Sequence, residues 1–378
     1  MNIGFDASRA FAKEATGTEN YSFQLLREML SIDTVNKYYV YTRIPREKIK
    51  FKFSQNVDVV FIDRPFLWTQ IGLASRTFQD PLDVLFVPAH TLPLIRRPGL
   101  PTVMTVHDLG AEYLPASHQL KQQLYLKFIT KYQLQTASHL VAVSEATKKD
   151  LMIKTKVKSG DISVIYEGVN FSTQNPVSLE AVEQTLRKFA LNRHEYFLFV
   201  GTIQPRKNLI RLIEAFSIFL IENESVDQNF KLVIAGKEGW DFKDILDLPK
   251  QLGIEKMVKF VGRVDDEELA VLYKNALALT YPSLFEGFGL PILESFFFGT
   301  PVITSNRSSM PEIAGKGAIL VNPEEVNDIM KAMQKIYNDK TTRLELIKYG
   351  KDQLIKFSWV EAAKATIKVL ETTAKEVK

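Results

Sequence analysis

The chain has 378 residues, of which 46% are hydrophobic and 24% charged, and its formal net charge is +4. This length and balance are typical of a globular enzyme of roughly two domains. No apolar run approaches the roughly 18 residues that a membrane span needs, and Met1 to Asp6 reads as a first strand rather than a signal peptide. The absence of cysteine excludes a disulfide framework, a thiolate nucleophile and a cysteine metal site. We therefore expect a cytoplasmic protein.

The mild positive charge does not form the sharp basic stripe that is typical of nucleic-acid-binding domains. The densest basic stretch holds Lys148, Lys149, Lys154, Lys156 and Lys158. It predicts either a solvated helix end and loop, or a patch for the anionic inner face of a membrane, where each lysine contributes about 1 kcal/mol. Nucleic acid is thus not an expected partner, and peripheral contact with the inner membrane face stays open.

In the first half of the chain, short apolar runs alternate with helical patterns. Strands are predicted at Ile3–Phe5, Tyr38–Tyr41, Val57–Ile62, Val84–Val87, Val103–Val106 and Leu140–Val143, and helices at Tyr21–Leu30, Gln119–Gln135 and Ala146–Met152. This alternation predicts a mostly parallel sheet that is covered on both faces, with ligands at the carboxyl ends of its strands.

Two stretches of the first half lie at such strand ends. Ala15–Asn20, which contains Gly17, follows the first strand and opens a helix, so it can approach a phosphate or be an ordinary capped helix start. His107-Asp108 directly follows the strand Thr102–Val106, so His107 can line a ligand site or hold the strand end.

The polar stretch from Phe171 to Val177 carries a proline and predicts a linker. A helix at Leu179–Phe189 then leads into a second alternating series, with strands at Tyr196–Val200, Leu232–Ala235, Val258–Val261, Ala276–Thr280 and Pro301–Thr304. Arg206 and Lys207 precede a helix at Leu209–Leu220, where amides and two charges suit a diphosphate; the alternative is a basic, exposed turn. The acids Asp265 to Glu268 are expected to complement a helix dipole.

One stretch of the second half, Leu284 to Glu294, concentrates the chemistry. Glu286 lies on the loop after a buried strand, and Pro291 suits the first turn of a helix that runs to Phe298. Glu294 lies about one turn into that helix. The backbone amides at the helix start favour an anion. Two carboxylates that accept hydrogen bonds from sugar hydroxyls, beside a phosphate-binding backbone, predict a nucleotide-sugar site.

The Glu-x7-Glu spacing, with Gly-Phe-Gly-Leu-Pro inside it and Gly-Thr-Pro-Val after it, resembles the retaining glycosyltransferases of family 4. The other matching motifs come in the family's order, namely the Gly17 loop, His107-Asp108, Ser144-Glu145, Gly201 to Asn208, and Gly262-Arg263-Val264. The resemblance implies the α/β GT-B fold, in which two Rossmann-like domains face a cleft. The acceptor-side domain would cover 1–172 and the donor-side domain 178–358, with a last helix, 359–378, packing back on the first.

The resemblance also implies roles for single residues. It assigns the donor diphosphate to Arg206, Lys207 and Gly17, the nucleoside to Arg263, Val264, Leu290 and Glu294, and the sugar to Glu286, Gly287, Phe288 and Gly289. It places His107 beside the anomeric carbon, so His107 and Glu286 are the catalytic candidates. Whether Glu286 is a nucleophile or only a sugar ligand stays open. Thr18 stands where many members have a second glycine.

The implied reaction moves a hexose, with retention, from a nucleoside-diphosphate sugar of UDP-glucose or GDP-mannose type to a saccharide or lipid-linked acceptor, in polysaccharide or glycoconjugate synthesis. No Asp-x-Asp triplet occurs, so we expect Arg206 and Lys207 to do the work of a metal, and no cofactor. The alternatives are a sugar-nucleotide-binding regulator without turnover and an epimerase of the same fold. A phosphorylase would need a lysine that binds pyridoxal phosphate, and no lysine of this chain is indicated for that role. A dinucleotide oxidoreductase would need a third glycine after Gly287 and Gly289.

Overall fold

The computed structural model describes residues 1–12, 17–89, 91–109, 131–169, 178–223, 226–227 and 229–376. The expected linker, Phe171–Val177, lies outside the described residues, as do residues 119–130 of the helix expected at Gln119–Gln135. The chain divides into two compact units: a first unit of Met1–Gly168 with Ser358–Lys378, and a second unit of Val169–Phe357.

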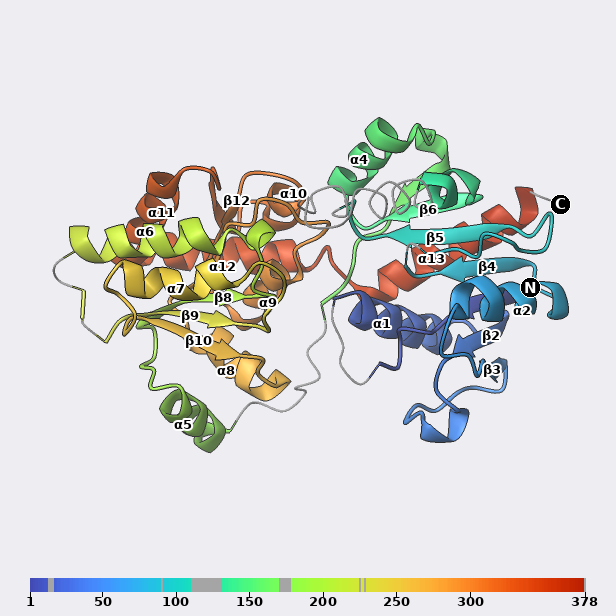
Figure 1. The fold of residues 1–378 in the computed structure, drawn as a ribbon, viewed down its shortest axis with the longest axis horizontal. Coiled ribbons are helices and arrows are strands. Elements are labelled where there is room, and N and C mark those ends of the chain that lie inside the picture. Colours follow the sequence, from blue (N-terminus) through green and yellow to red (C-terminus); the bar gives the residue numbers. More distant parts are fainter. Residues whose placement is uncertain are drawn as a thin grey trace. The chain divides into compact units, whose positions relative to one another are not determined.

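The first unit is built on a parallel sheet in the order β3-β2-β1-β4-β5-β6-β7 (Figure 1). Its strands are β1 Asn2–Asp6, β2 Lys37–Thr42, β3 Val57–Phe61, β4 Val84–Val87, β5 Thr102–Val106, β6 His139–Ala142 and β7 Ile162–Val164. The order reverses between β1 and β4, the kind of point at which open α/β sheets bind ligands. All residues of β4 and β5 are buried, as expected for strands that are covered on both faces.

The helices of the first unit include one from the far end of the chain. They are α1 Gly17–Ile32, α2 Ala74–Gln79, α4 Glu145–Thr155 and α13 Trp359–Glu376, with the short turns η1 Arg46–Lys48, η2 Trp68–Leu73 and η4 Ser159–Asp161. Helix α13 packs against α1 and the strands β4 to β6. At its start, a Cβ on Gly168 would lie 2.3 Å from the Trp359 nitrogen, so only glycine permits this approach. The last helix is thus an integral part of the first unit.

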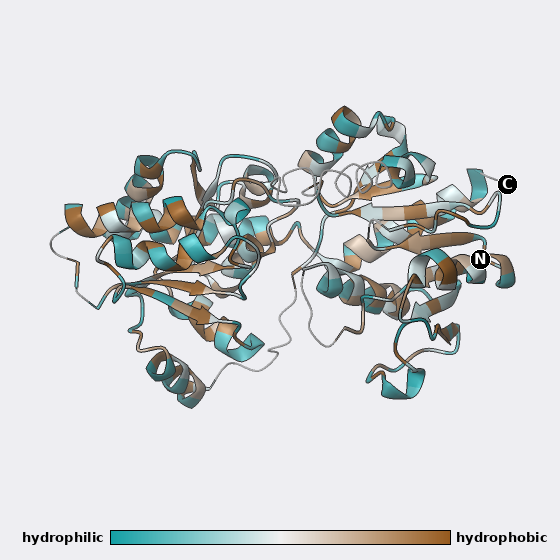
Figure 2. Ribbon diagram, viewed as in Figure 1, coloured by the Kyte–Doolittle hydropathy of each residue, from teal (hydrophilic) through white to brown (hydrophobic). Residues whose placement is uncertain are grey.

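The second unit holds a parallel sheet in the order β10-β9-β8-β11-β12-β13. Its strands are β8 Tyr196–Val200, β9 Lys231–Ala235, β10 Val258–Gly262, β11 Ala278–Tyr281, β12 Val302–Ser305 and β13 Ala318–Val321. Its helices are α5 Leu179–Lys188, α6 Leu209–Glu222, α7 Lys243–Gln251, α8 Asp266–Asn275, α9 Leu290–Phe298, α10 Met310–Ala314, α11 Val326–Asn338 and α12 Lys340–Leu354, with the turn η5 Pro205–Lys207. Figure 2 shows apolar strands in both units beneath helices with one polar face.

Glycines end three neighbouring strands of the second sheet. Gly201 follows β8, Gly236 follows β9 and Gly262 ends β10, all with positive φ. A Cβ on Gly236 would lie 1.9 Å from the Gly201 carbonyl oxygen, so the two backbones are in direct contact. Side chains are therefore kept away from the carboxyl ends of these strands, where a ligand of a doubly wound sheet binds.

Candidate functional site

The loop between β11 and α9 carries Glu286 and is fixed by its own backbone. Gly289 has φ +112° at the start of α9, a conformation that an L side chain rarely adopts. Ser309 Oγ donates to the carbonyls of Glu286 (3.0 Å) and Phe288 (2.6 Å), and Ser308 Oγ also donates to the Glu286 carbonyl. These serines, just before α10, hold the loop at both ends of its glycine turn.

Glu286 forms ion pairs with both neighbouring cations. Lys207 Nζ donates to Glu286 Oε1 at 2.6 Å, and Arg206 Nη1 donates to Glu286 Oε2 at 2.9 Å. The side chains of Lys207 and Glu286 are each 8% exposed, whereas that of Arg206 is 27% exposed. Burial favours the neutral acid, but Lys207 and Arg206 outweigh it and lower the pKa of Glu286 to about 2. Glu286 is thus ionised at neutral pH and lies between the two cations.

Lys207 is also held by an aromatic neighbour. Its Nζ donates to the Tyr281 hydroxyl at 2.6 Å and lies 4.9 Å from the centre of the Tyr281 ring. Arg206 and Lys207 belong to η5 and not to the following helix, because Asn208, with φ +62°, separates the two. Both cations therefore directly precede α6, as the sequence predicts. Asn208 fixes the turn by donating to the carbonyls of Pro282 (3.0 Å) and Pro323 (2.6 Å).

Glu294 lies one turn into α9, as expected, and faces a different set of groups. The Tyr273 hydroxyl donates to Glu294 Oε2 at 2.7 Å. Burial raises the pKa of Glu294 to about 6, the Tyr273 hydrogen bond opposes this rise, and the charge of Asp266 adds to it. Glu294 is therefore a carboxyl that changes charge near neutral pH, unlike Glu286.

The remaining second-unit candidates occupy the same strand ends. Arg263, exposed, and Val264, partly buried, follow β10, and Leu290 is the partly buried first residue of α9. Gly287, Phe288 and Gly289 are buried. The Asp265 side chain accepts from the Glu268 amide at 2.8 Å, and Glu268 bonds back to the Asp265 amide, so these two acids form a capping box at the start of α8. Asp266, Glu267 and Glu268 lie in the first turn of the helix, where negative charge complements its dipole as expected.

His107 lies at the end of β5, and both of its ring nitrogens face oxygen acceptors. Nε2 is 3.0 Å from the Pro88 carbonyl and Nδ1 is 3.4 Å from Glu167 Oε1, while the Tyr21 ring meets the imidazole edge-on at 4.6 Å. Burial opposes protonation of His107, but the hydrogen bond and charge of Glu167 outweigh it and raise its pKa. The sequence did not nominate Glu167, which lies 60 positions away in the segment after β7.

Gly17 is the first residue of α1, and among the described residues no atom lies within 4 Å of an added Cβ. Ala15 and Thr16 of the same loop lie outside the described residues. Ser144 caps α4 by accepting from the Thr147 amide at 3.1 Å. The roles of these candidates toward a ligand stay predictions.

Two Rossmann-like units of parallel sheet define the GT-B class of glycosyltransferase folds. Residues 17–173 match the family profile described as Glycosyltransferase Family 4, and residues 182–353 match that described as Glycosyl transferases group 1. An uncharacterized glycosyltransferase of Methanocaldococcus jannaschii is 30% identical over 281 residues, which cover 71% of this chain and 69% of that protein. The chain belongs to the family 4 glycosyltransferases.

Two further comparisons agree with this class. The O-antigen chain mannosyltransferase B of Escherichia coli is 29% identical over 265 residues, which cover 70% of this chain and 68% of that protein. The structure of sucrose-phosphate synthase from Thermosynechococcus elongatus superposes with a TM-score of 0.76 at 20% identity, over 98% of each chain, which shows the shared fold. The matched region spans 63% of a Salmonella mannosyltransferase and only 30% of a larger Escherichia coli one.

Proposed function

We propose that this glycosyltransferase moves a mannosyl group from GDP-mannose to a saccharide acceptor in polysaccharide synthesis, with retention and without a metal. The observation that carries the proposal is the cluster of Lys207, Arg206 and Glu286 beside the start of α9. The choice of mannose over glucose is supported by the relatives, because several of them are mannosyltransferases of O-antigen chains.

The two cations suit the diphosphate of the donor. Without a ligand both cations contact Glu286, close to the α9 amides, which also favour an anion. A nucleotide sugar brings two negative phosphates, so it can take over both cations and release Glu286. The freed carboxylate would then accept hydrogen bonds from sugar hydroxyls, with Gly287, Phe288 and Gly289 forming the backbone around the sugar.

The nucleoside end suits the groups around α9 and β10. Glu294 would accept hydrogen bonds from the ribose hydroxyls, and Arg263, Val264 and Leu290 would border the base. The glycines that end β8, β9 and β10 keep side chains away from this edge of the sheet. Gly17, which belongs to the first unit, would approach the diphosphate with its backbone.

In the proposed reaction the bond from the anomeric carbon to the phosphate oxygen breaks as the acceptor oxygen attacks from the same face. The acceptor's proton passes to the leaving phosphate oxygen, and Arg206 and Lys207 stabilise the charge that develops there. His107, oriented by Glu167 and the Pro88 carbonyl, would align the sugar. Glu286 stays a sugar ligand in this scheme, because the acceptor oxygen attacks the anomeric carbon directly and no second nucleophile is needed.

Among the described helices, none is long and apolar enough to cross a membrane. Peripheral contact with the inner face would use the exposed Lys149, Lys156 and Lys158 at and after α4. Sedimentation with phosphatidylglycerol vesicles tests this contact. Loss of sedimentation in Lys149→Glu/Lys158→Glu supports it, and sedimentation equal to that of the wild type contradicts it.

A panel of sugar nucleotides, measured by thermal shift, tests the donor. A ligand at 100 times its dissociation constant stabilises the folded chain by about 2.7 kcal/mol. We expect GDP-mannose to raise the melting temperature most, and Arg206→Ala to abolish the rise. If UDP-glucose alone stabilises the chain, the donor assignment is wrong. If no sugar nucleotide does, and no nucleoside diphosphate is released with any saccharide acceptor, the proposed function fails.

A further inference from the structure

Each of the two cations assigned to the donor diphosphate has a second oxygen partner besides Glu286. Lys207 Nζ donates to Glu286 Oε1 and to the Tyr281 hydroxyl, each at 2.6 Å. Arg206 Nη1 donates to Glu286 Oε2 at 2.9 Å and to the Phe285 carbonyl at 3.1 Å. In the proposed function Glu286 is the partner that leaves when the diphosphate arrives. The second partner then decides where each cation stays.

Tyr281, the second partner of Lys207, is held in place by the strands on both sides of it. It is the buried last residue of β11, which lies between β8 and β12 in the sheet. The Phe199 ring of β8 stacks on the Tyr281 ring with centres 5.8 Å apart, and Thr304 Oγ1 of β12 donates to the Tyr281 carbonyl at 2.9 Å. A ring packed in this way keeps one rotamer, so its hydroxyl is a fixed point of the sheet. The partner of Arg206 differs, because Phe285 belongs to the same loop as Glu286.

The Tyr281 hydroxyl is a neutral acceptor. Burial and the charge of Glu286 raise the pKa of Tyr281 well above its ordinary value, although Arg206 opposes this rise. The hydroxyl therefore keeps its proton at neutral pH and accepts from Lys207 through a lone pair. A carboxylate in its place would cancel the positive charge that a diphosphate needs. A hydroxyl fixes the ammonium group and leaves its charge in place.

The rest of the Lys207 side chain is confined as well. Lys207 is buried, and a Cβ added to Gly201 would lie 3.6 Å from Lys207 Cε. Its ammonium group lies 4.9 Å from the centre of the Tyr281 ring, within the range of a cation–π contact. A lysine side chain is flexible, so an ammonium group without a fixed partner would follow Glu286 when that carboxylate moves.

A buried tyrosine in this sheet does not need a charged partner. Tyr196 of β8 is also buried, and its hydroxyl donates to the Leu272 carbonyl at 2.7 Å. That one bond satisfies a buried hydroxyl without any cation. Tyr281, on the neighbouring strand, directs its hydroxyl to a cation of the donor site instead. Positioning of Lys207 requires this arrangement, and stability of the sheet alone does not.

We propose that Tyr281 is a positioning residue, whose hydroxyl keeps the Lys207 ammonium group at the diphosphate when the donor displaces Glu286. This inference rests on the proposed function and adds a residue that the sequence motif does not indicate. The phosphate takes the N–H bond that Glu286 gives up, while the N–H bond to Tyr281 stays in place. Tyr281 thus acts on the donor only through Lys207.

Calorimetric titration with GDP tests this role in a double-mutant cycle. Tyr281→Phe removes the hydroxyl, keeps the ring, and should weaken GDP binding about tenfold, the scale of a hydrogen bond to a charged group. In a Lys207→Met background the same change should have no effect, because no ammonium group remains to be positioned. In an Arg206→Ala background it should weaken GDP binding as much as it does in the wild type.

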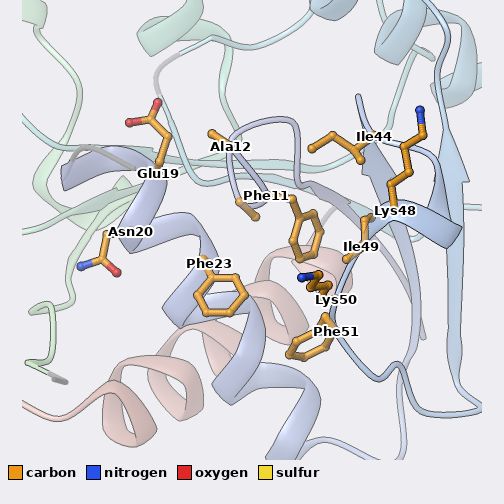
Figure 3. Close-up of a pocket in the computed structure, with 11 residues that line it drawn as sticks. Phe11, Ala12, Glu19, Asn20, Phe23, Ile44, Lys48, Ile49, Lys50 and Phe51 are labelled. Atoms are coloured by element: carbon orange, nitrogen blue, oxygen red, sulfur yellow. The ribbon is translucent and has the colours of Figure 1, made fainter. Parts of the chain in front are cut away.

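Two control variants match the two changes. Tyr196→Phe removes another buried hydroxyl from the same sheet and should bind GDP as the wild type does. Lys50→Met removes one positive charge, as Lys207→Met does, but from the first unit, where Lys50 lines a pocket together with Phe11 and Phe23 (Figure 3). Unchanged GDP affinity in Lys50→Met would show that the loss in Lys207→Met does not come from net charge.

Three outcomes would overturn the proposal: wild-type GDP affinity in Tyr281→Phe, an equal loss in Tyr196→Phe, or a loss that persists in full without Lys207. The last would make the effect of Tyr281 structural. If Tyr281→Phe does not fold, Phe199→Leu takes its place in the same cycle, with a smaller loss expected, because it loosens the ring and keeps the hydroxyl. Binding of GDP-mannose by the wild-type chain tests the proposed function independently, so the two failures are distinguishable.

Discussion

The raised pKa of Glu294 predicts that donor affinity depends on pH in a way that one substitution removes. A ribose hydroxyl donates to a carboxylate but gains little from a protonated acid, so the binding form is the ionised one. With a pKa of about 6, Glu294 is almost fully ionised at pH 7.5, and about one chain in eleven is ionised at pH 5.0. The apparent dissociation constant of GDP-mannose should therefore rise about tenfold, or about 1.4 kcal/mol, between these pH values.

Titration calorimetry at constant ionic strength measures this change. GDP-mannose is suitable because its diphosphate is esterified at both ends and keeps its charge over this range. The control Glu294→Gln should bind more weakly than the wild type at pH 7.5 and with the same affinity at pH 5.0. Asp266→Asn removes a charge that raises the pKa of Glu294, so its transition should move to lower pH. Parallel curves for the wild type and Glu294→Gln would refute the reasoning.

The same group gives a second readout, in stability. Because the folded chain holds the Glu294 proton more tightly than the unfolded chain does, this residue stabilises the fold below pH 4.5, and that stability is lost as the pH rises through 6. The shift from 4.5 to about 6 corresponds to at most about 2 kcal/mol, and less in practice because Glu294 is only partly buried.

The other groups carry four further predictions. Transfer activity should survive excess EDTA, because Arg206 and Lys207 stabilise the leaving diphosphate; an absolute need for Mg²⁺ or Mn²⁺ contradicts this. Glu286→Gln should lower kcat at least 100-fold without weakening bare GDP, since it frees both cations, and a large loss of GDP affinity in calorimetry would contradict the assignment. His107→Ala should lower kcat about 100-fold, which corresponds to some 2.7 kcal/mol of barrier, and should change donor affinity less than threefold; a normal kcat in this variant would return His107 to a structural role. Glu167→Gln should lower the pKa of His107, measured by NMR titration.

Much of the fold follows from local pattern. The strand–helix alternation predicts both sheets, and the turn at Gly289 with Pro291 predicts the start of α9 to within a residue. The short strands β7 and β13 are not predicted, because an apolar run of three or four residues has no period of its own.

What the sequence does not show is which strand ends become neighbours. Lys207 and Glu286 meet across 79 positions because β8 pairs with β11, an order that alternation alone leaves open. Glu167 reaches His107 because β5, β6 and β7 lie side by side. The serines at 308 and 309 give no sequence signal as loop anchors, since their bonds go to backbone carbonyls.

The place of α13 in the first unit has a consequence for synthesis of the chain on the ribosome. Roughly 190 residues separate Gly168 from Ser358, and at about 5–20 residues per second they take roughly 10–40 s to make. During that time α1 lacks its partner helix, and the second unit becomes complete before α13 is made. Trp359 packs on Tyr21, which in turn contacts His107, so the surroundings of this histidine are finished only once α13 has been made. A chain that ends early would hold a complete second unit beside an unfinished first one.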